Sequence, residues 1–293
     1  MTHASPVLNQ IDDSASHGPH AGDEAYQPPP MARPVMASWS EVTDPSNTFA
    51  EPMMLSGLSR SACAFDLLLF GAYMVGYFVV ISFLFAKGPE EEPGVDFRLV
   101  NVAVTLGGGA VSVIVVAILT RMRGLHAASL GLTWNRLPAN LLLGLAMTLA
   151  TFAVFYLSIL GIAVLWPAGF EELKSNPHRI AQNLPRLPLV GFAGLALCVG
   201  FYEEAVFRGF LLSRLRRLTG SWALAVPLGA LVFALPHVQM QAAPTAVPLF
   251  FLAVLWSVNV WWRRSLVPII VGHFLFNFIQ FVGMAYFQNP DWR

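Results

Sequence analysis

The fold is decided by the stretch from residue 189 to residue 212, which reads LVGFAGLALCVGFYEEAVFRGFLL. This stretch is long and apolar enough for a membrane-spanning helix, because a span needs roughly 20 apolar residues. Glu203, Glu204 and Arg208 nevertheless lie at its centre. On insertion scales each ionised group at mid-bilayer depth costs about 2.5–3.5 kcal/mol. Charges in such a place indicate a functional site inside a bundle of helices.

The whole chain has the composition of a membrane protein. Of its 293 residues, 56% are hydrophobic and 12% are charged, and the mean hydropathy is +0.60. Soluble domains carry about 25% charged residues, so these values favour a polytopic membrane protein. The formal net charge of zero gives no reason to expect nucleic acid as a partner. Cys63 and Cys198 fall in predicted membrane segments, where we interpret them as small apolar side chains.

The apolar runs predict an all-α fold, a polytopic bundle of about seven to eight transmembrane helices. Seven candidate spans can be delimited, at residues 62–86, 99–120, 139–167, 188–213, 222–237, 245–262 and 266–287. The third is long enough to tilt or to contain a break, and the fifth is short and contains Pro227 and Pro236. No internal repeat of the kind that builds many transporters is evident.

The first part of the chain has a different composition. Residues 1–60 contain Pro28-Pro29-Pro30, scattered acidic residues and few apolar runs, which predicts a disordered cytoplasmic tail. A signal peptide is not expected, because no basic segment precedes an early apolar core. The predicted transmembrane domain then covers residues 61–293.

The positions of the arginines predict the orientation. They follow the second, fourth and sixth spans, and the alternate loops contain fewer basic residues. These arginines are Arg121, Arg123, Arg136, Arg214, Arg216, Arg217, Arg263 and Arg264. Because cytoplasmic loops carry an excess of Lys and Arg, we expect a multi-pass protein of the cell (inner) membrane with a cytoplasmic N-terminus.

Four formal charges lie inside the predicted spans. Asp66 is near the start of its span, where a position at the membrane interface would explain it. Glu204 and Arg208 are four residues apart, so they share a helix face and can form a pair. Glu203 points about 100° away from Glu204, which leaves it available for chemistry. A purely structural Glu204–Arg208 pair is the alternative interpretation.

Two histidines fall within or at the ends of spans. His237 lies four residues after Phe233, and His273 lies four residues before Asn277, on the same helix face. A single membrane histidine is most often a hydrogen-bonded structural residue. Two of them together with Glu203 and an asparagine indicate a chemical site.

These side chains are suited to hydrolysis by an activated water. A carboxylate removed from water is a stronger base, a neutral histidine can help to deprotonate a water, and a second histidine with an asparagine can stabilise an oxyanion. The chain contains neither Gly-x-Ser-x-Gly nor His-Glu-x-x-His. Zn²⁺ held by two histidines and one glutamate remains an alternative, with Glu204, His237 and His273 as candidate ligands.

Three motifs, in this order, resemble the signature of the CPBP intramembrane proteases. This is the CAAX-protease and bacteriocin-processing group, also called the Abi family, which includes the type II CaaX prenyl endopeptidases. The motifs are Glu203-Glu204-x-x-x-Arg208, Phe233-x-x-x-His237 and His273-x-x-x-Asn277. They fall within residues 187–287, which we take as the catalytic motif region. Residues 129–134 (SLGLTW) resemble the family's upstream loop.

The resemblance implies an intramembrane peptidase, either a metalloprotease or a glutamate-dependent endopeptidase. It implies a catalytic set consisting of the motif residues Glu203, Glu204, Arg208, His237, His273 and Asn277. Glu203 would act with His237 on the attacking water, and His273 with Asn277 would form the oxyanion site. The expected substrate is a membrane-associated or prenylated-like peptide or protein.

Two other functions stay open at this point. One is a non-proteolytic immunity or scaffold protein with the same fold, and the other is a proton-coupled transporter that uses Glu203 and the histidines as a relay. Besides its substrate, the protein is expected to contact membrane lipid.

Overall fold

The computed structural model describes residues 55, 57–85, 97–133, 136–239 and 241–287, and helices are the regular structure of this part of the chain. The long helices are α3 (Arg60–Phe85), α4 (Phe97–Met122), α5 (Leu137–Leu165), α8 (Leu189–Glu203), α10 (Trp222–Ala234), α11 (Ala246–Arg263) and α12 (Val267–Phe287). Shorter helices extend or connect them: η1 (Ala127–Leu130), α6 (Pro167–Leu173), α7 (Asn176–Asn183), η2 (Glu204–Leu211), α9 (Leu212–Thr219), η3 (Leu235–Gln239) and η4 (Ala243–Thr245). The predicted all-α fold is confirmed. The predicted tail, apart from a few residues at its end, lies outside the described residues.

Six helical stretches of the described chain are long and apolar enough to cross a membrane. They are Arg60–Val80, Arg98–Met122, Leu137–Leu165, Leu189–Thr219, Ala243–Arg263 and Val267–Ala285. A seventh apolar stretch, Trp222–Val238, is shorter. The chain is therefore an integral, multi-pass membrane protein. The shorter stretch is the predicted fifth span, and its α-helix ends at Ala234, just ahead of Pro236.

Between α5 and α8, where the sequence predicts a loop between two spans, the chain forms two short helices. Helix α6 begins directly at Pro167, and α7 has Pro177 in its first turn. Proline is favoured at these positions because its backbone angle φ suits a helix and its missing N–H would have no partner there. The break between α5 and α6 falls at Trp166, so the long third span ends where its sequence meets a proline.

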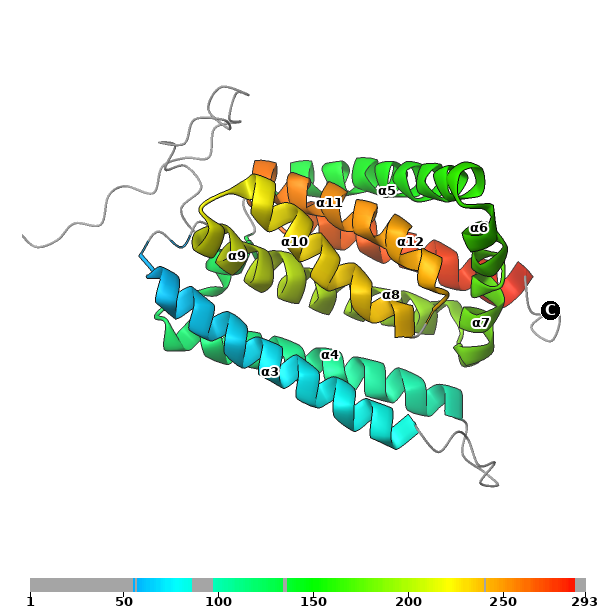
Figure 1. Ribbon diagram of the computed structural model, residues 1–293, viewed down its shortest axis with the longest axis horizontal. Helices are drawn as coiled ribbons and strands as arrows, with labels where there is room; N and C mark the ends of the chain where they lie inside the picture. The colour runs from blue at the N-terminus through cyan, green and yellow to red at the C-terminus, as the bar shows by residue number, and fades with distance from the viewer. Residues whose placement is uncertain (1–54, 56, 86–96, 134–135, 240, 288–293) are drawn as a thin grey trace, which may run out of the picture.

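The long helices form three layers (Figure 1). Helices α3 and α4 lie along one side, α8, α9 and α10 form the middle, and α5, α11 and α12 lie on the other side. Helix α12 packs against both α5 and α8. Of the two histidine-bearing elements, α12 therefore packs directly against the helix that carries the glutamates, and η3 packs against α10, η4 and α11.

Glycines bring α12 close to its two main neighbours. A Cβ at Gly144 on α5 would lie 2.6 Å from the Cβ of Val271, and a Cβ at Gly200 on α8 would lie 3.2 Å from the backbone nitrogen of Phe274. The same Gly200 position is 3.6 Å from the Cβ of His273. Small residues allow close contact between helices in membranes. Here they place His273 beside the end of α8, where the glutamates begin.

The loop between α4 and α5 braces the glutamate helix. A Cβ at Gly209 would lie 2.8 Å from the carbonyl oxygen of Leu130, so only glycine permits this contact. Gly131, with a left-handed φ of 81°, accepts a hydrogen bond from the backbone N–H of Leu266 at 2.9 Å. This loop is the segment that resembles the family's upstream loop; its Trp134 lies outside the described residues.

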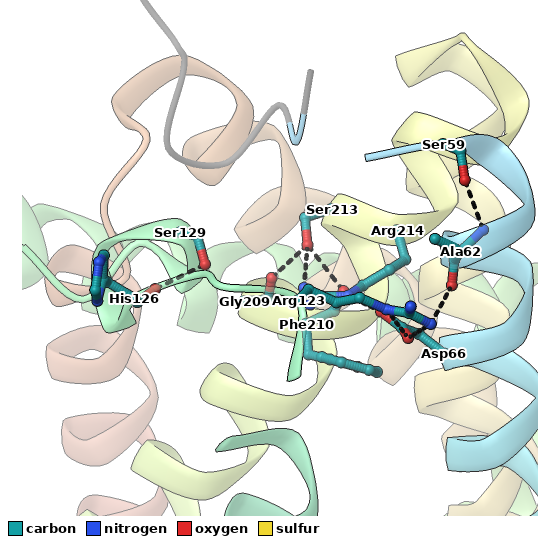
Figure 2. Close-up of polar contacts among 10 residues, drawn as sticks. All are labelled: Ser59, Ala62, Asp66, Arg123, His126, Ser129, Gly209, Phe210, Ser213 and Arg214. Atoms are coloured by element: carbon teal, nitrogen blue, oxygen red, sulfur yellow. Dashed lines mark hydrogen bonds and ion pairs between the residues drawn. The ribbon is translucent and has the colours of Figure 1, made fainter. Parts of the chain in front are cut away.

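Asp66, which the sequence places near the start of its span, is fully buried within the protein (Figure 2). Its Oδ1 accepts hydrogen bonds from Arg123, with Nε at 2.9 Å and Nη2 at 2.7 Å, and its Oδ2 lies 3.6 Å from Nε of Arg214. The guanidinium of Arg214 also packs 4.0 Å over the ring of Phe210. Asp66 thus ties α3 to the end of α4 and to α9. Its cost in the membrane is offset by two cations, and its role is structural.

Candidate active site

Glu204 begins a π-helical segment, η2, which continues α8 without a break and leads into α9. In a π-helix each N–H bonds to the carbonyl five residues earlier, so the helix is wider than an α-helix. Such segments are rare and are frequently found at functional sites. Glu203 is the last residue of α8, so the two glutamates flank the point where the helix widens.

Glu204 is fully buried and held by two donors. Its Oε1 lies 3.2 Å from Nη1 of Arg208 and 2.8 Å from Nδ1 of His273. The pair with Arg208 that the four-residue spacing predicted is therefore confirmed. The contact with His273 joins the first and third motifs across η2 and α12. Buried charges need such partners, because an isolated carboxylate in an apolar interior is strongly disfavoured.

Arg208 is itself buried between aromatic rings. Its guanidinium lies 4.2 Å from the ring centre of Phe233 and 5.0 Å from that of Trp256. A cation over an aromatic face is attracted by the electron density of the ring, more strongly when both are removed from water. The two rings therefore replace water around the cation that neutralises Glu204.

Glu203 is the less buried glutamate, with 14% of its side chain exposed. Its Oε2 lies 3.7 Å from Nε2 of His273, and the hydroxyl of Tyr202 lies 3.5 Å from its Oε1. Both separations exceed the length of a strong hydrogen bond. Polar groups at this spacing can be joined by a water. Glu203 is thus near donors but is not locked in an ion pair, in contrast to Glu204.

His273 presents one ring nitrogen to each glutamate. It is 4% exposed, with Nδ1 against Glu204 and Nε2 facing Glu203. A carboxylate only accepts hydrogen bonds, so Nδ1 must donate to Glu204. The neutral ring then has an unprotonated Nε2, and the protonated ring carries a second N–H there. Nε2 of His273 can therefore accept a hydrogen bond near Glu203 when the ring is neutral and donate one when the ring is protonated.

The other two motif residues do not contact the glutamates directly. His237 lies in η3, and its Nδ1 donates to the backbone carbonyl of Phe233 at 2.9 Å, with the two rings 5.1 Å apart. This bond fixes the orientation of the imidazole ring through Nδ1 and does not involve the other ring nitrogen, Nε2. Asn277 lies one helical turn beyond His273 and is partly buried, and its side chain makes no hydrogen bond with another described residue. The first and third motifs converge closely, and the second joins them through Phe233 and Arg208.

The predicted metal ligands do not gather at one point. Among the described residues, no group of three or more His, Cys, Asp or Glu side chains is placed to hold a metal ion. Of the predicted ligands, Glu204 is already paired with Arg208, and His237 is ion-paired with neither glutamate in the described structure. In the described structure the three candidate ligands therefore form no metal-binding group, and the mechanism proposed for the site is written with the protein's own side chains.

An apolar cleft opens beside the second motif. It has a volume of about 650 Å³ and lies between α3 and the end of α10. Its lining is Val75, Phe78, Val79, Ser82, Val232, Leu235 and Pro236. Pro236 precedes His237, so the cleft adjoins the second motif. The cleft is open, and Val75, Val79, Val232 and Leu235 in its lining are exposed.

Three residues around the site were not predicted from the sequence. Trp256 stacks on His273 with ring centres 4.4 Å apart, Thr151 bonds to Trp256, and Tyr202 approaches Glu203. Tyr202 could have been noticed as the polar neighbour of Glu203 in an apolar run. Trp256 and Thr151 carry no such signal, because they belong to other helices and resemble ordinary apolar packing residues.

Comparison with known proteins identified one family for the motif region. Residues 185–279 match the model of the type II CAAX prenyl endopeptidase Rce1-like family. A search of curated proteins and a search of solved structures each gave no match. The matched residues nearly coincide with the predicted motif region, 187–287, and contain all six predicted site residues. Over residues 185–279 the match confirms the resemblance to the CPBP intramembrane proteases, and it supports a CAAX-type intramembrane protease.

Proposed function

We propose that this protein is an endopeptidase that hydrolyses a peptide bond within the membrane by means of a water activated by Glu203. The observation that carries this proposal is that two adjacent carboxylates have different contacts. Glu204 is paired with Arg208 and His273, whereas Glu203 has only longer contacts. A carboxylate that is near donors but not held in a short ion pair is suited to accept a proton.

The proposed mechanism requires His273 in its protonated form, because Nδ1 already donates to Glu204 and Nε2 must also carry an N–H. Glu203 and Glu204 contribute two negative charges, and Arg208 contributes one positive charge. A protonated His273 between the glutamates would bring the formal sum to zero, which is favourable in an apolar interior. In that state Nε2 carries an N–H that faces Glu203. This donor is suited to stabilising an oxyanion.

The reaction can then be written with the protein's own side chains. Glu203 removes a proton from the water, whose oxygen bonds to the carbonyl carbon of the scissile peptide. The resulting oxyanion accepts hydrogen bonds from Nε2–H of His273 and from the side-chain amide of Asn277. Glu203 returns its proton to the amide nitrogen, the C–N bond breaks, and a carboxylic acid and an amine are released. We assign His237 the task of holding the water through its Nε2.

The substrate we propose is a membrane-associated peptide or protein with a prenyl-like apolar group. The apolar cleft between α3 and α10 supports this, because it adjoins the His237 motif and is lined mainly by apolar side chains. The apolar group would lie in the cleft, and the peptide beside it would reach the glutamates. The proposed location is the cell membrane, with the N-terminus in the cytoplasm, in line with the positions of the arginines.

A cleavage assay on the purified protein tests this function. The substrates are a fluorogenic CaaX-type peptide with and without its prenyl group. The variants are Glu203→Gln and, as a matched control, Glu171→Gln, which changes an exposed carboxylate paired with Lys174 on α6. We expect cleavage by the wild type and by the control, and none by Glu203→Gln, with the prenylated peptide preferred.

Each cleavage reaction is repeated in the presence of a zinc chelator. The Glu203 mechanism predicts that cleavage continues in the presence of the chelator. If the chelator abolishes cleavage, a metal-dependent mechanism replaces this one. If wild type and Glu203→Gln cleave equally, Glu203 is not the base. If no peptide is cleaved, a non-proteolytic role of the same fold is favoured over this proposal.

A further inference from the structure

Trp256 on α11 contacts both His273 and Arg208. It is 1% exposed, and its ring stacks on the imidazole of His273 with 4.4 Å between ring centres and 26° between planes. Stacking of this kind sets the plane of the smaller ring. Its contact with Arg208, at 5.0 Å, places the same ring against the cation that neutralises Glu204.

Thr151 on α5 fixes the rotation of that tryptophan. The indole N–H of Trp256 donates to the hydroxyl oxygen of Thr151 at 3.0 Å, and Thr151 is fully buried. A buried indole N–H without an acceptor is unfavourable, so this bond selects one orientation of the ring. The bond joins α5 to α11.

The chemistry assigned to His273 depends on the plane of its ring. Nδ1 bonds to Glu204 at 2.8 Å, while Nε2 must face the reacting atoms near Glu203, 3.7 Å away. The hydrogen bond to Glu204 fixes one atom but allows the ring to rotate about that contact. Stacking on Trp256 removes this freedom. Small misplacements of catalytic groups are costly, since a shift of about 1 Å can lower a rate about 100-fold.

From these contacts we infer that Trp256 and Thr151 are positioning residues for His273. They touch no reacting atom: Trp256 holds the plane of the imidazole, and Thr151 holds Trp256. This inference rests on the proposed function, in which Nε2 of His273 stabilises the oxyanion. It adds α5 and α11, which carry none of the three motifs, to the parts of the fold that determine the reaction rate.

Paired substitutions at each residue separate positioning from general packing. Trp256→Phe keeps a stacking ring, and Trp256→Leu removes it. Thr151→Ser keeps the hydroxyl, and Thr151→Val removes it with little change in volume. The packing control is Phe70→Leu on α3, a buried ring that contacts Tyr73 and Phe210 and no residue assigned to the reaction.

The kinetic result expected is a loss of kcat with little change in KM. Trp256→Leu and Thr151→Val should lower kcat about 10- to 100-fold, with KM within about twofold of the wild type because substrate binding is not altered. Thr151→Ser should recover most of the activity lost in Thr151→Val, and Trp256→Phe should exceed Trp256→Leu. Phe70→Leu should keep kcat. Equal kcat in wild type, Trp256→Leu and Thr151→Val would overturn the inference.

A second readout does not depend on cleavage. Diethyl pyrocarbonate acylates accessible imidazole nitrogens, and mass spectrometry of the peptide that contains His273 measures how much has reacted. We expect His273 to be protected in the wild type and in Phe70→Leu, and to react several-fold faster in Trp256→Leu because its covered face is opened. Unchanged protection in Trp256→Leu would count against the stacking role.

The two readouts distinguish failure of the inference from failure of the proposed function. If the wild type cleaves nothing but the labelling of His273 rises only in the Trp256→Leu protein, the proposed function fails and the positioning of His273 stands. If Trp256→Leu does not fold, the comparison of Thr151→Val with Thr151→Ser decides. A Thr151→Val protein with wild-type kcat would then refute the inference.

Discussion

Replacing Arg208 by methionine should destabilise the protein strongly, because it would leave Glu204 without its main counter-charge. Glu204 is fully buried, and Arg208 is 2% exposed and enclosed by Phe233 and Trp256. Removing one partner of a buried ion pair costs about 3–5 kcal/mol. We expect the lower end of this range, about 3 kcal/mol, because Nδ1 of His273 would still bond to Glu204.

The size of the effect on thermal unfolding follows from the length of the chain. For chains of this size each kcal/mol shifts the unfolding midpoint by about 2–4 °C, so Arg208→Met should lower it by about 6–12 °C. The assay is loss of helical circular dichroism on heating in detergent. All variants are heated at one scan rate, since unfolding of membrane proteins is often irreversible. Arg121→Met, which changes an exposed arginine near the end of α4, should stay within about 0.5 kcal/mol of the wild type.

A double substitution tests whether Arg208 stabilises the charge on Glu204. In Arg208→Met with Glu204→Gln, the unpaired charge is gone, and the new amide oxygen can still accept the hydrogen bond from His273. The double variant should therefore recover about 1–3 kcal/mol relative to Arg208→Met, a coupling typical of residues in direct contact. If the two substitutions are simply additive, the charge on Glu204 is not what Arg208 stabilises. A wild-type midpoint in Arg208→Met would refute the pairing altogether.

Three further predictions follow from the described contacts. Asp66→Asn should lower stability by about 2–4 kcal/mol in the same melting assay, because it weakens the ties to Arg123 and Arg214; an unchanged midpoint would make the contacts of Asp66 incidental. Gly200→Ala should cost about 1–3 kcal/mol and lower kcat, since the new Cβ would press on the part of α12 that carries His273, and full activity would show that α12 adjusts freely. His237→Gln should retain more cleavage than His237→Asn, because the amide of Gln can take the place of Nε2 whereas the amide of Asn replaces Nδ1. The reverse order would assign the essential role to the bond between Nδ1 and the Phe233 carbonyl.

Parts of this structure were predictable because their causes lie close together in the sequence. Apolar runs give the spans, and the four-residue spacing gives the pair of Glu204 with Arg208. The short fifth span was also expected, since Pro236 limits α10 locally. In each case the residues that decide the outcome are within a few positions of one another. The three motifs in order added the resemblance to a family, because each motif is specific only in combination with the others.

Other features depend on contacts between distant segments. The buried ion pairs of Asp66 could not be predicted, because its partners, Arg123 and Arg214, come from other segments and have no fixed spacing from it. The contact of His273 with Glu204 requires the close approach of α12 and α8, which depends on glycines whose role is visible only in the packing. Trp256 is one apolar residue among many in α11. No periodicity in the sequence marks the one that stacks on a histidine.

The π-helical segment is also not evident from the sequence. Ordinary α-helical geometry places Glu203 and Glu204 about 100° apart, and the four-residue spacing correctly pairs Glu204 with Arg208. It does not predict that the helix widens from Glu204 to Leu211. Residues in this segment follow a different angular spacing, so the directions of its side chains had to come from the structure.

The measurement that tests the account most directly is the kcat of Glu203→Gln relative to the wild type, at equal folding and with the substrate that the wild type prefers. The substitution keeps the size of the side chain and removes its ability to accept a proton. General base catalysis contributes about 10²–10⁴-fold, so kcat should fall by at least about 100-fold while the unfolding midpoint stays near that of the wild type. A Glu203→Gln protein that folds and cleaves at the wild-type rate would contradict the claim that Glu203 activates the water.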